Sequence, residues 1–264
     1  MNLDLHGRRA LVTGSTAGIG LATARLFAEE GAIVVVNGRT ESRVHAAIAA
    51  IRDAVPDASC EAAVADLGSA AGCSAVATMV PEVDILVNNA GIFEPKPFED
   101  IPDDDWLRFF EVNVMSGVRL ARAYLPGMRA RDWGRIVFVS SESALQIPVE
   151  MIHYGMTKTA QLAIARGLAE AVAGTGITVN SVLPGPTASE GVEGFVADMA
   201  RARGVDVGTV EQDFFATARP SSLLKRFERP EEVAAMIVYV CSGRASGTTG
   251  AALRVDGGVV RSIA

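Results

Sequence analysis

The alternation of short apolar runs with longer helical stretches is the feature that most restricts how this chain can fold. Apolar runs of strand length occupy residues 9–12, 33–36, 61–64, 84–87, 135–139, 177–182 and 251–255. Stretches with helical character lie between them, at residues 19–30, 41–55, 70–79, 103–131, 152–173 and 230–241. The run at 33–36 is too continuous for a half-exposed strand, so helices are expected on both faces of the sheet. The pattern predicts an α/β fold with right-handed crossovers and a doubly wound, seven-stranded parallel sheet.

The chain is predicted to form a single Rossmann-type domain over residues 1–264. Of its 264 residues, 49% are hydrophobic, which is enough to bury a large aliphatic core. No Pro/Ser-rich linker, low-complexity tract, charge block or fixed-period repeat divides the sequence.

One irregular stretch, residues 189–228, interrupts the alternation before the last helix. A short amphipathic helix is predicted there by apolar residues at i, i+3, i+4 and i+7, namely Val192, Phe195, Val196 and Met199. Further apolar residues follow at Phe214, Phe215, Leu223 and Leu224. Two roles are open for this insertion: a lid on the substrate side, or a contact with a partner subunit.

The charge balance argues against two classes of partner. With 24 Lys and Arg against 31 Asp and Glu, the formal net charge is -7. Such a chain has no general attraction to phosphate backbones or anionic lipid, so neither nucleic acid nor membrane is expected as a partner. Residues 1–7 carry acid where a signal peptide needs base, and no apolar run approaches the ~20 residues of a spanning helix. A cytoplasmic location is therefore expected.

The cysteines and the acidic cluster do not predict a metal site. The three cysteines, Cys60, Cys73 and Cys241, are odd in number and scattered, which indicates free thiols in a reducing compartment. The acids at residues 103–105 follow Pro102 at the start of a predicted helix, where they are favoured by the helix dipole.

A glycine-rich loop lies between the first predicted strand and the first predicted helix. Its sequence is Thr13-Gly14-Ser15-Thr16-Ala17-Gly18-Ile19-Gly20. Unpaired amides and the positive end of the helix dipole attract a pyrophosphate at such a turn. The Gly-Lys-[Ser/Thr] ending of a Walker loop is missing, so the loop predicts a dinucleotide rather than a nucleoside triphosphate.

The end of the second strand bears on the choice between NADP and NAD. The turn there is Asn37-Gly38-Arg39 and carries no carboxylate that would bind a ribose hydroxyl. Arg39 offers a forked, charge-assisted pairing to a 2′-phosphate. NADP is therefore favoured. NAD remains possible, because Ala17 supplies no second cation from the glycine loop.

A tyrosine and a lysine lie one helical turn apart, close to the end of a predicted strand. Tyr154 and Lys158 share one helix face, and Ser141 follows the apolar run 135–139 at the sheet edge where α/β proteins bind ligands. An ammonium ~5 Å away at an effective dielectric of ~20 stabilises a phenolate by roughly 3 kcal/mol, although burial acts in the opposite direction. We expect the pKa of Tyr154 to be lowered toward neutrality.

Taken in order, these motifs resemble those of the short-chain dehydrogenase/reductase family over nearly the whole chain. The matching positions are Thr13-Gly14-x-x-x-Gly18-Ile19-Gly20, Asp66, Asn88-Asn89-Ala90-Gly91, Asn113, Ser141, Tyr154-x-x-x-Lys158, and Pro184-Gly185 with Thr187 and Ser189. One departure is Gly155-Met156-Thr157, where small Ala and Ser residues are common in the family.

The resemblance implies a catalytic role for four residues. Tyr154 would exchange a proton with the substrate oxygen, and Ser141 would orient that oxygen. Lys158 would lower the tyrosine pKa and hold the nicotinamide ribose, while Asn113 would anchor a water that relays protons to Lys158. Ser141 is preferred to Ser140 because successive strand residues point to opposite sides.

The resemblance also implies a set of cofactor contacts. They are Gly14, Ser15, Thr16, Gly18, Ile19, Gly20, Arg39, Asp66, Leu67, Asn89, Ala90, Gly91, Tyr154, Lys158, Pro184, Gly185, Thr187 and Ser189. Within this set, Asp66 and Leu67 would contact the adenine. The substrate pocket is expected to be lined by Glu142, Ser143, Gln146, Met151 and His153.

The function predicted on this basis is an NADP(H)-preferring carbonyl reductase or alcohol dehydrogenase that acts on a secondary alcohol/ketone pair. Two alternatives stay open: an isomerase, dehydratase or epimerase on the same scaffold, and a non-catalytic nucleotide-sensing protein. The resemblance implies a homodimer or homotetramer.

Overall fold

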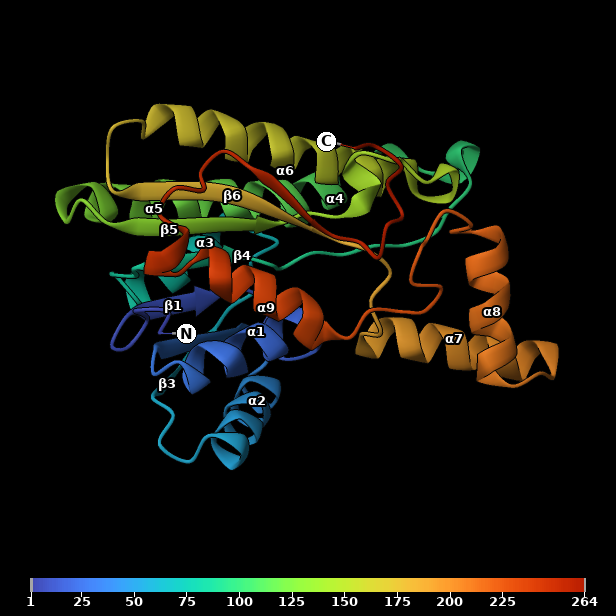
Figure 1. Cartoon of the computed structure of the whole chain (residues 1–264), viewed down its shortest axis with the longest axis horizontal. Coiled ribbons are helices and arrows are strands. Elements are labelled where there is room, and N and C mark those ends of the chain that lie inside the picture. Colours follow the sequence, from blue (N-terminus) through green and yellow to red (C-terminus); the bar gives the residue numbers. More distant parts are fainter. Residues whose placement is uncertain (1, 264) are drawn as a thin grey trace.

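A seven-stranded parallel sheet forms the centre of the molecule, as the computed structural model shows (Figure 1). The structure describes residues 2–263, except for the side chains of residues 193 and 195. The strands are β1 (Arg9–Val12), β2 (Ile33–Gly38), β3 (Cys60–Val64), β4 (Ile85–Asn88), β5 (Gly134–Val139), β6 (Ile177–Pro184) and β7 (Ala252–Val255). Their order across the sheet is β3-β2-β1-β4-β5-β6-β7, with every pair parallel. The predicted sheet is confirmed.

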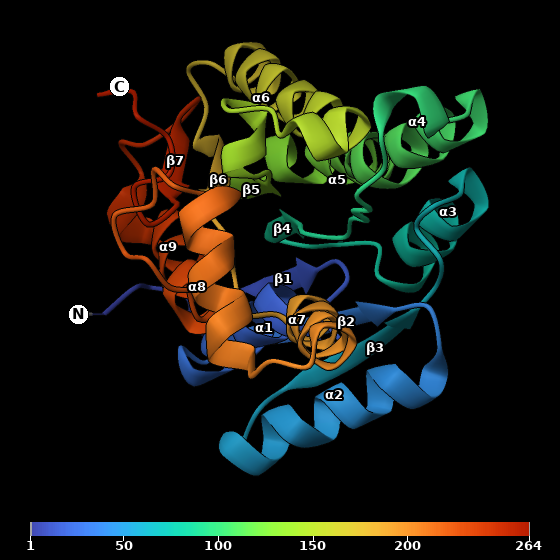
Figure 2. The ribbon, with the colours of Figure 1, turned by 90° about the vertical axis from the view of Figure 1, so that its right-hand side faces the viewer.

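Helices cover both faces of this sheet (Figures 1 and 2). One face carries α1 (Gly18–Glu29), α2 (Glu41–Ala54) and α9 (Pro230–Val240). The other face carries α3 (Ala70–Met79), α5 (Ser116–Ala130) and α6 (Ile152–Ala171), with α4 (Asp103–Phe110) packed against α6. Short helical turns are η1 (Phe98–Asp100), η2 (Glu111–Met115), η3 (Glu142–Ala144), η4 (Val149–Met151) and η5 (Gly243–Ala245).

The strand side chains alternate between the two hydrophobic layers. On β2, Val34 and Val36 pack into the layer of α1, α2 and α9, whereas Val35 packs into the layer of α3, α5 and α6. On β5, Val137 enters the first layer and Phe138 the second. All five residues are essentially inaccessible to solvent. Because both faces are buried, the strands are apolar without a gap, which is why their sequences lack alternation.

The predicted helical stretch 103–131 is helical as expected, with a change of helix type in its middle. A π-helical turn, η2, separates α4 from α5 and contains Asn113. A π turn inserts a residue into the helix while keeping its direction, and such insertions are frequent at functional sites. The predicted helical stretch is therefore confirmed, while the π insertion was not predicted, because the apolar periodicity on either side hides it.

Residues 189–228 contain two helices where one was predicted. Helix α7 (Glu190–Arg203) covers the predicted amphipathic helix, and α8 (Val207–Thr217) follows it. Asp206 caps α8 by accepting a hydrogen bond from the Thr209 N–H at 2.9 Å. Both helices lie beyond the strand ends, at the right of Figure 1.

These two helices enclose a small hydrophobic cluster of their own. The buried members are Val196, Ala200 and Val210, with Val192, Met199 and Phe227 packed against them. The Phe195 side chain, also assigned to the apolar face of α7, lies outside the described part of the structure. Of the other predicted apolar residues, Phe215 is buried, whereas Leu223 and Leu224 are exposed.

In residues 2–263, no helix is long and apolar enough to cross a membrane. Over the same part of the chain, no group of His, Cys, Asp and Glu is arranged to hold a metal ion. Cys60, Cys73 and Cys241 are all free thiols, as predicted.

Candidate active site

The glycine loop after β1 forms a close-fitting turn that only glycine permits at several positions. Gly14 and Gly18 have φ values of +62° and +54°, a region that favours glycine. A Cβ on Gly20 would lie 2.4 Å from the Gly14 carbonyl oxygen and 2.6 Å from Asn89 Nδ2. The loop therefore presents bare backbone at the N-terminus of α1, where the amides and the helix dipole suit a pyrophosphate.

Polar side chains beneath the loop fix its shape. Asn89 Nδ2 donates to the carbonyl oxygens of Thr13 at 2.8 Å and Gly14 at 3.1 Å. Ser15 Oγ donates to the Val12 carbonyl oxygen at 2.7 Å and accepts from the Asn37 N–H at 3.0 Å. The Ser15 hydroxyl and the Asn89 amide nitrogen are thus occupied in supporting the loop.

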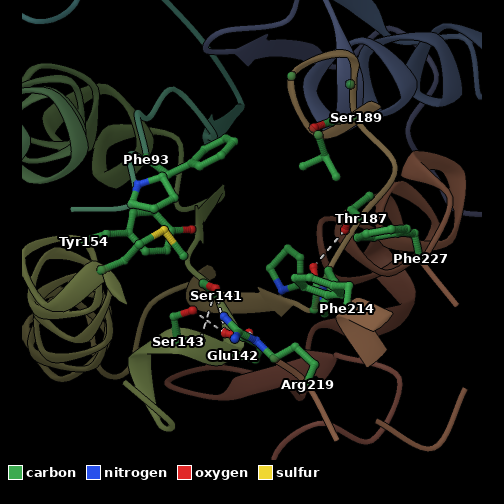
Figure 3. A pocket seen from close by; sticks show the side chains of 18 of the residues that line it. Phe93, Ser141, Glu142, Ser143, Tyr154, Thr187, Ser189, Phe214, Arg219 and Phe227 are labelled. Carbon is green, nitrogen blue, oxygen red and sulfur yellow. Dashed lines mark hydrogen bonds and ion pairs between the residues drawn. The ribbon is translucent and has the colours of Figure 1, made fainter. Parts of the chain in front are cut away.

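A cavity of about 710 Å³ opens at the carboxyl edge of the sheet beside this loop (Figure 3). Its lining includes many predicted cofactor residues: Gly18, Ile19, Gly20, Asn89, Gly91, Tyr154, Lys158, Pro184, Gly185, Thr187 and Ser189. The cavity continues past Ser141 and Tyr154 to the inner side of α7 and α8. A dinucleotide extending from the glycine loop would therefore bring its nicotinamide end next to these two side chains, and the residues present fit such a cofactor.

The remaining predicted cofactor residues lie outside the cavity lining. They are Gly14, Ser15, Thr16, Arg39, Asp66, Leu67 and Ala90. Arg39 is exposed just beyond β2, and Asp66 is exposed just beyond β3, where its carboxylate accepts from the Gly68 N–H at 3.0 Å. Leu67 is buried in the core behind them. The surface at these two strand ends is the place where the adenosine half of a dinucleotide would lie.

Tyr154, Lys158 and Ser141 meet on one side of the cavity. Tyr154 and Lys158 come from successive turns of α6, with Lys158 Nζ 5.5 Å from the tyrosine ring centroid. Lys158 Nζ donates to the Val139 carbonyl oxygen at 2.9 Å, which ties the helix to the end of β5. Ser140 points the other way and donates to the Lys158 carbonyl oxygen at 2.8 Å. Both serines border the cavity, but the Ser140 hydroxyl is bound to α6, whereas the Ser141 hydroxyl lies within hydrogen-bonding reach of Tyr154.

Burial dominates the protonation of this pair. It raises the pKa of Tyr154 above its usual value, and a hydrogen bond with Ser141 offsets only part of that rise. It lowers the pKa of Lys158 to about 8. The expected lowering of the Tyr154 pKa toward neutrality is thus wrong for this structure, because desolvation of the phenolate is the largest effect and the charge of Glu142 adds to it. At neutral pH the phenol holds its proton.

Asn113 is held at the π-helical turn through its side-chain amide and its main-chain oxygen. Its Oδ1 accepts from the Ile92 N–H at 2.7 Å, and its Nδ2 donates to the Ile92 carbonyl oxygen at 2.9 Å and to Thr157 Oγ1 at 3.0 Å. Its main-chain oxygen accepts from Gln161 Nε2 at 2.7 Å. Asn113 therefore joins the loop after β4 to α6, and the sequence analysis did not single out Gln161 as its partner.

A buried ion pair next to Ser141 was also missed. Arg219 Nε donates to Glu142 Oε1 at 2.8 Å, and Arg219 Nη1 donates to Glu150 Oε1 at 3.1 Å. The side chains of Arg219 and Glu142 are only 9% and 4% exposed. Because Arg219 lies 77 residues beyond Glu142, no local pattern in the sequence signals this pair.

Three of the five residues expected around the substrate line the cavity, and two do not. Glu142, Ser143 and Met151 line the cavity. Gln146 is exposed outside it. His153 is buried against Phe109, with ring centroids 4.1 Å apart. The prediction that Gln146 and His153 line the pocket was wrong. In the first turn of α6, the His153 side chain faces α4, whereas the Tyr154 side chain faces the cavity. Apolar walls come from Phe93, Pro95, Val192, Met199, Phe214 and Phe227.

Comparison with known proteins agrees with this architecture. A family model described as short chain dehydrogenase matches residues 8–200. The chain is 49% identical over 263 residues to an uncharacterized oxidoreductase, YvaG, of Bacillus subtilis, with both chains covered in full. It is 34% identical over 260 residues to a D-beta-hydroxybutyrate dehydrogenase of Cupriavidus necator, covering 97% of this chain and 99% of that protein.

A solved structure is similar over its whole length. L-Sorbose reductase from Gluconobacter frateurii, complexed with NADPH and L-sorbose, superimposes with a TM-score of 0.94 at 33% identity, and 100% of each chain is covered. The chain thus belongs to the short-chain dehydrogenase/reductase family and is an NAD(P)-dependent oxidoreductase that acts on CH–OH and C=O groups.

Proposed function

We propose that this protein is an NADP(H)-preferring carbonyl reductase that interconverts a ketone and a secondary alcohol, with Tyr154 as the general acid and base. The observation that carries the proposal is the meeting of Tyr154, Ser141 and Lys158 in one cavity that begins at the glycine loop. A protein that only senses a nucleotide has no need for an acid and a hydrogen-bond donor beside the nicotinamide end of its site.

The proposed chemistry divides between the cofactor and the chain. Bound NADPH supplies the hydride to the carbonyl carbon. Negative charge then develops on the carbonyl oxygen, which Ser141 stabilises by donating a hydrogen bond. Tyr154 gives that oxygen its proton, and the raised pKa of the phenol keeps this proton in place at neutral pH before the reaction.

Lys158 and Asn113 support this transfer in the proposal. When Tyr154 gives up its proton, the ammonium 5.5 Å from its ring stabilises the resulting phenolate. Asn113, fixed between Ile92 and Thr157, lies with Lys158 around Gly91, because a Cβ on Gly91 would lie 3.3 Å from Asn113 Oδ1 and 3.6 Å from Lys158 Nζ. A water bound between them would return a proton to Tyr154 through Lys158.

The preference for NADP rests on Arg39. Its guanidinium is exposed at the end of β2, and the preceding residues, Asn37 and Gly38, offer no carboxylate that would repel a 2′-phosphate. The similar L-sorbose reductase is complexed with NADPH. We expect Arg39→Ala to raise the KM for NADPH at least about tenfold while leaving the KM for NADH unchanged. Equal KM values for both cofactors, unaltered in the variant, would contradict the preference and favour NAD.

Two further roles belong to this proposal. Residues 189–228 would act as a lid, because α7 and α8 form the outer wall of the cavity. The chain would assemble as a homodimer or homotetramer, since α5 and α6 expose a shallow apolar depression lined by Val118, Ala121, Leu125, Ile164 and Leu168. Light scattering that shows a monomer at working concentration would contradict the assembly.

The activity itself is tested by a screen of ketones and aldehydes with NADPH and with NADH, following the loss of absorbance of the reduced nicotinamide. We expect at least one ketone to be reduced faster with NADPH. A panel on which no compound is reduced would contradict the proposal and shift support to an isomerase, a dehydratase or a nucleotide sensor.

A further inference from the structure

Glu142 is a buried carboxylate next to the residue that is proposed to bind the substrate oxygen. It lies on the floor of the cavity between Ser141 and Arg219 (Figure 3). Its Oε2 accepts hydrogen bonds from the hydroxyls of Ser141, at 3.1 Å, and Ser143. Its Oε1 accepts from Arg219 Nε at 2.8 Å. Arg219 therefore fixes one oxygen of this carboxylate, while the other faces the two serines.

Substrate binding changes the hydrogen bonds of this carboxylate. The Ser141 hydroxyl has a single proton, and in this structure the proton is directed at Glu142. To bind a carbonyl oxygen, Ser141 must turn that proton away from Glu142. A buried carboxylate that loses a donor is unfavourable unless another donor replaces it. The hydrogen bond from Ser143 to Glu142 remains. The hydrogen bond lost from Ser141 leaves an accepting position on Glu142 that faces the substrate.

We propose that Glu142, held by Arg219, accepts a hydrogen bond from a substrate hydroxyl on the carbon next to the carbonyl. The inference rests on the proposed function and defines its substrates as α-hydroxyketones. In such a compound the hydroxyl and carbonyl oxygens are about as far apart as two hydrogen-bonded oxygens. While Ser141 binds the carbonyl oxygen, the neighbouring hydroxyl therefore reaches Glu142 Oε2, 3.1 Å from Ser141 Oγ.

The charges around Arg219 favour a neutral hydroxyl over a substrate carboxylate. Arg219 already faces two carboxylates, Glu142 and Glu150, so this group of three carries a net charge of −1 when all are ionised. A substrate carboxylate would compete with both for one guanidinium. The hydrogen bonds of Arg219 use Nε and Nη1, and Nη2 makes none with the described residues. That nitrogen is available to donate to the oxygen of the same substrate hydroxyl.

The opposite wall of the cavity is suited to the carbon chain of the substrate. Phe93 packs edge-on against Tyr154 with ring centroids 6.4 Å apart, and Phe214 stacks on Phe227 at 5.1 Å. These rings give no hydrogen bonds, whereas Glu142 and Arg219 supply polar groups directly beside Ser141. The combination predicts a substrate with a polar carbonyl end and an apolar remainder.

The test compares ketones that differ only by a hydroxyl and a methyl group. Hydroxyacetone and butanone have the same shape, as do α-hydroxyacetophenone and propiophenone. We expect the wild type to have a higher kcat/KM for the hydroxyketone in each pair, and Glu142→Gln to lower that value at least about tenfold. In the variant, Arg219 holds the amide oxygen, so the amide NH2 faces the substrate and cannot accept from its hydroxyl. The plain ketones should lose less than about threefold.

A matched control and a binding measurement keep the result interpretable. Asp213→Asn removes the same charge from a carboxylate that lines the cavity but pairs with Arg203 away from Ser141, and it should leave the hydroxyketone preference unchanged. Calorimetric titration of the wild type saturated with NADP⁺ measures binding without turnover. It should show tighter binding of each hydroxyketone than of its partner, and this measurement requires no variant to fold.

The outcomes distinguish a failure of this inference from a failure of the proposed function. Equal losses on both members of a pair in Glu142→Gln would make Glu142 only a support for Ser141, and the inference would be overturned while carbonyl reduction stands. Equal binding of both members by the wild type would overturn it in the same way. If no ketone of any kind oxidises NADPH, the proposed function fails and the inference fails with it.

Discussion

The two sides of the cavity are built in different ways. On the catalytic side, Lys158, Asn113 and Ser140 are buried and are bound to main-chain groups of neighbouring elements. On the substrate side, α7 and α8 pack around three buried residues. The segment joins the rest of the chain through the bridge between Thr187 and Glu228 and through the ion pairs Arg43–Glu190 and Arg219–Glu142. The catalytic side is held by the core of the sheet, whereas the substrate side is held mainly by its own small hydrophobic cluster.

This difference separates the chemistry from the choice of substrate. Where many buried hydrogen bonds fix a side chain, its geometry persists until the whole domain unfolds. A small cluster at the edge of the domain opens at a lower free energy, as loops and lids that admit ligands generally do. Changes in the small hydrophobic cluster of α7 and α8 should therefore alter which substrates are bound and leave the proton transfer intact.

The largest expected effect is that of Lys158→Met, on the catalytic side. Activity should fall at least about a hundredfold, because the phenolate of Tyr154 loses its cation. Stability should change in the opposite direction. The pKa of Lys158 is about 8 in the fold and 10.5 ordinarily, so the unfolded chain binds more protons between these values and wild-type stability rises with pH there.

Below about pH 8 the full penalty of burying this charge opposes folding, up to about 3 kcal/mol. Lys158→Met removes the penalty, partly offset by the unsatisfied carbonyl of Val139, and should raise the Tm at pH 7 but not above about pH 10. Denaturation curves at both pH values measure this. A lower Tm at pH 7 would show that the lysine stabilises the catalytic side rather than straining it.

Glu228→Gln tests the junction between the two sides. Burial raises the pKa of Glu228 to about 7 from 4.5, so the folded chain binds more protons than the unfolded chain between these values. Wild-type stability should therefore fall as the pH rises through this window, by up to roughly 3 kcal/mol. The glutamine variant should lack this loss, which a comparison of Tm at about pH 5 and about pH 8 measures. Parallel pH dependence of both proteins would contradict the assignment.

A pair of equal substitutions compares the two hydrophobic clusters directly. Val137 on β5 and Val210 on α8 are buried alike. Val137→Ala should cost about 2 to 3 kcal/mol of unfolding free energy, and Val210→Ala about 1 kcal/mol, because the edge cluster relaxes more easily around the cavity. Only Val210→Ala should change the KM for a ketone. Equal costs in urea denaturation would mean that α7 and α8 are as firmly held as the sheet.

The elements of the sheet core were predictable, whereas the long-range contacts were not. Buried parallel strands require unbroken apolar runs, so the strands at residues 33–36 and 135–139 could be predicted from the sequence. The positions of Ser141, Tyr154 and Lys158 follow from strand ends and helix turns. The π turn at Asn113 depends on its contacts with Ile92 and Thr157. These residues are distant in the sequence, so the local hydrophobic periodicity does not indicate the contacts.

The other features that were not predicted also depend on contacts between residues distant in the sequence. The pair of Arg219 with Glu142 joins residues 77 positions apart. The rise in the Tyr154 pKa follows from how deeply α6 packs against β5, and the sequence gives only the spacing of the tyrosine and the lysine. Helix α8, by contrast, had a visible signal in Asp206, a residue favoured as an N-cap, three positions before Thr209.

The most direct test of the central claim compares two tyrosines, one in the cavity and one in the core. Tyr154 lines the cavity, whereas Tyr124 is buried in α5 and its hydroxyl has no partner among the described residues. With a ketone reduced by the wild type, Tyr154→Phe should lower kcat at least about a hundredfold with unchanged NADPH affinity, and Tyr124→Phe should have no effect on kcat. Retention of most of the turnover in Tyr154→Phe would contradict the account.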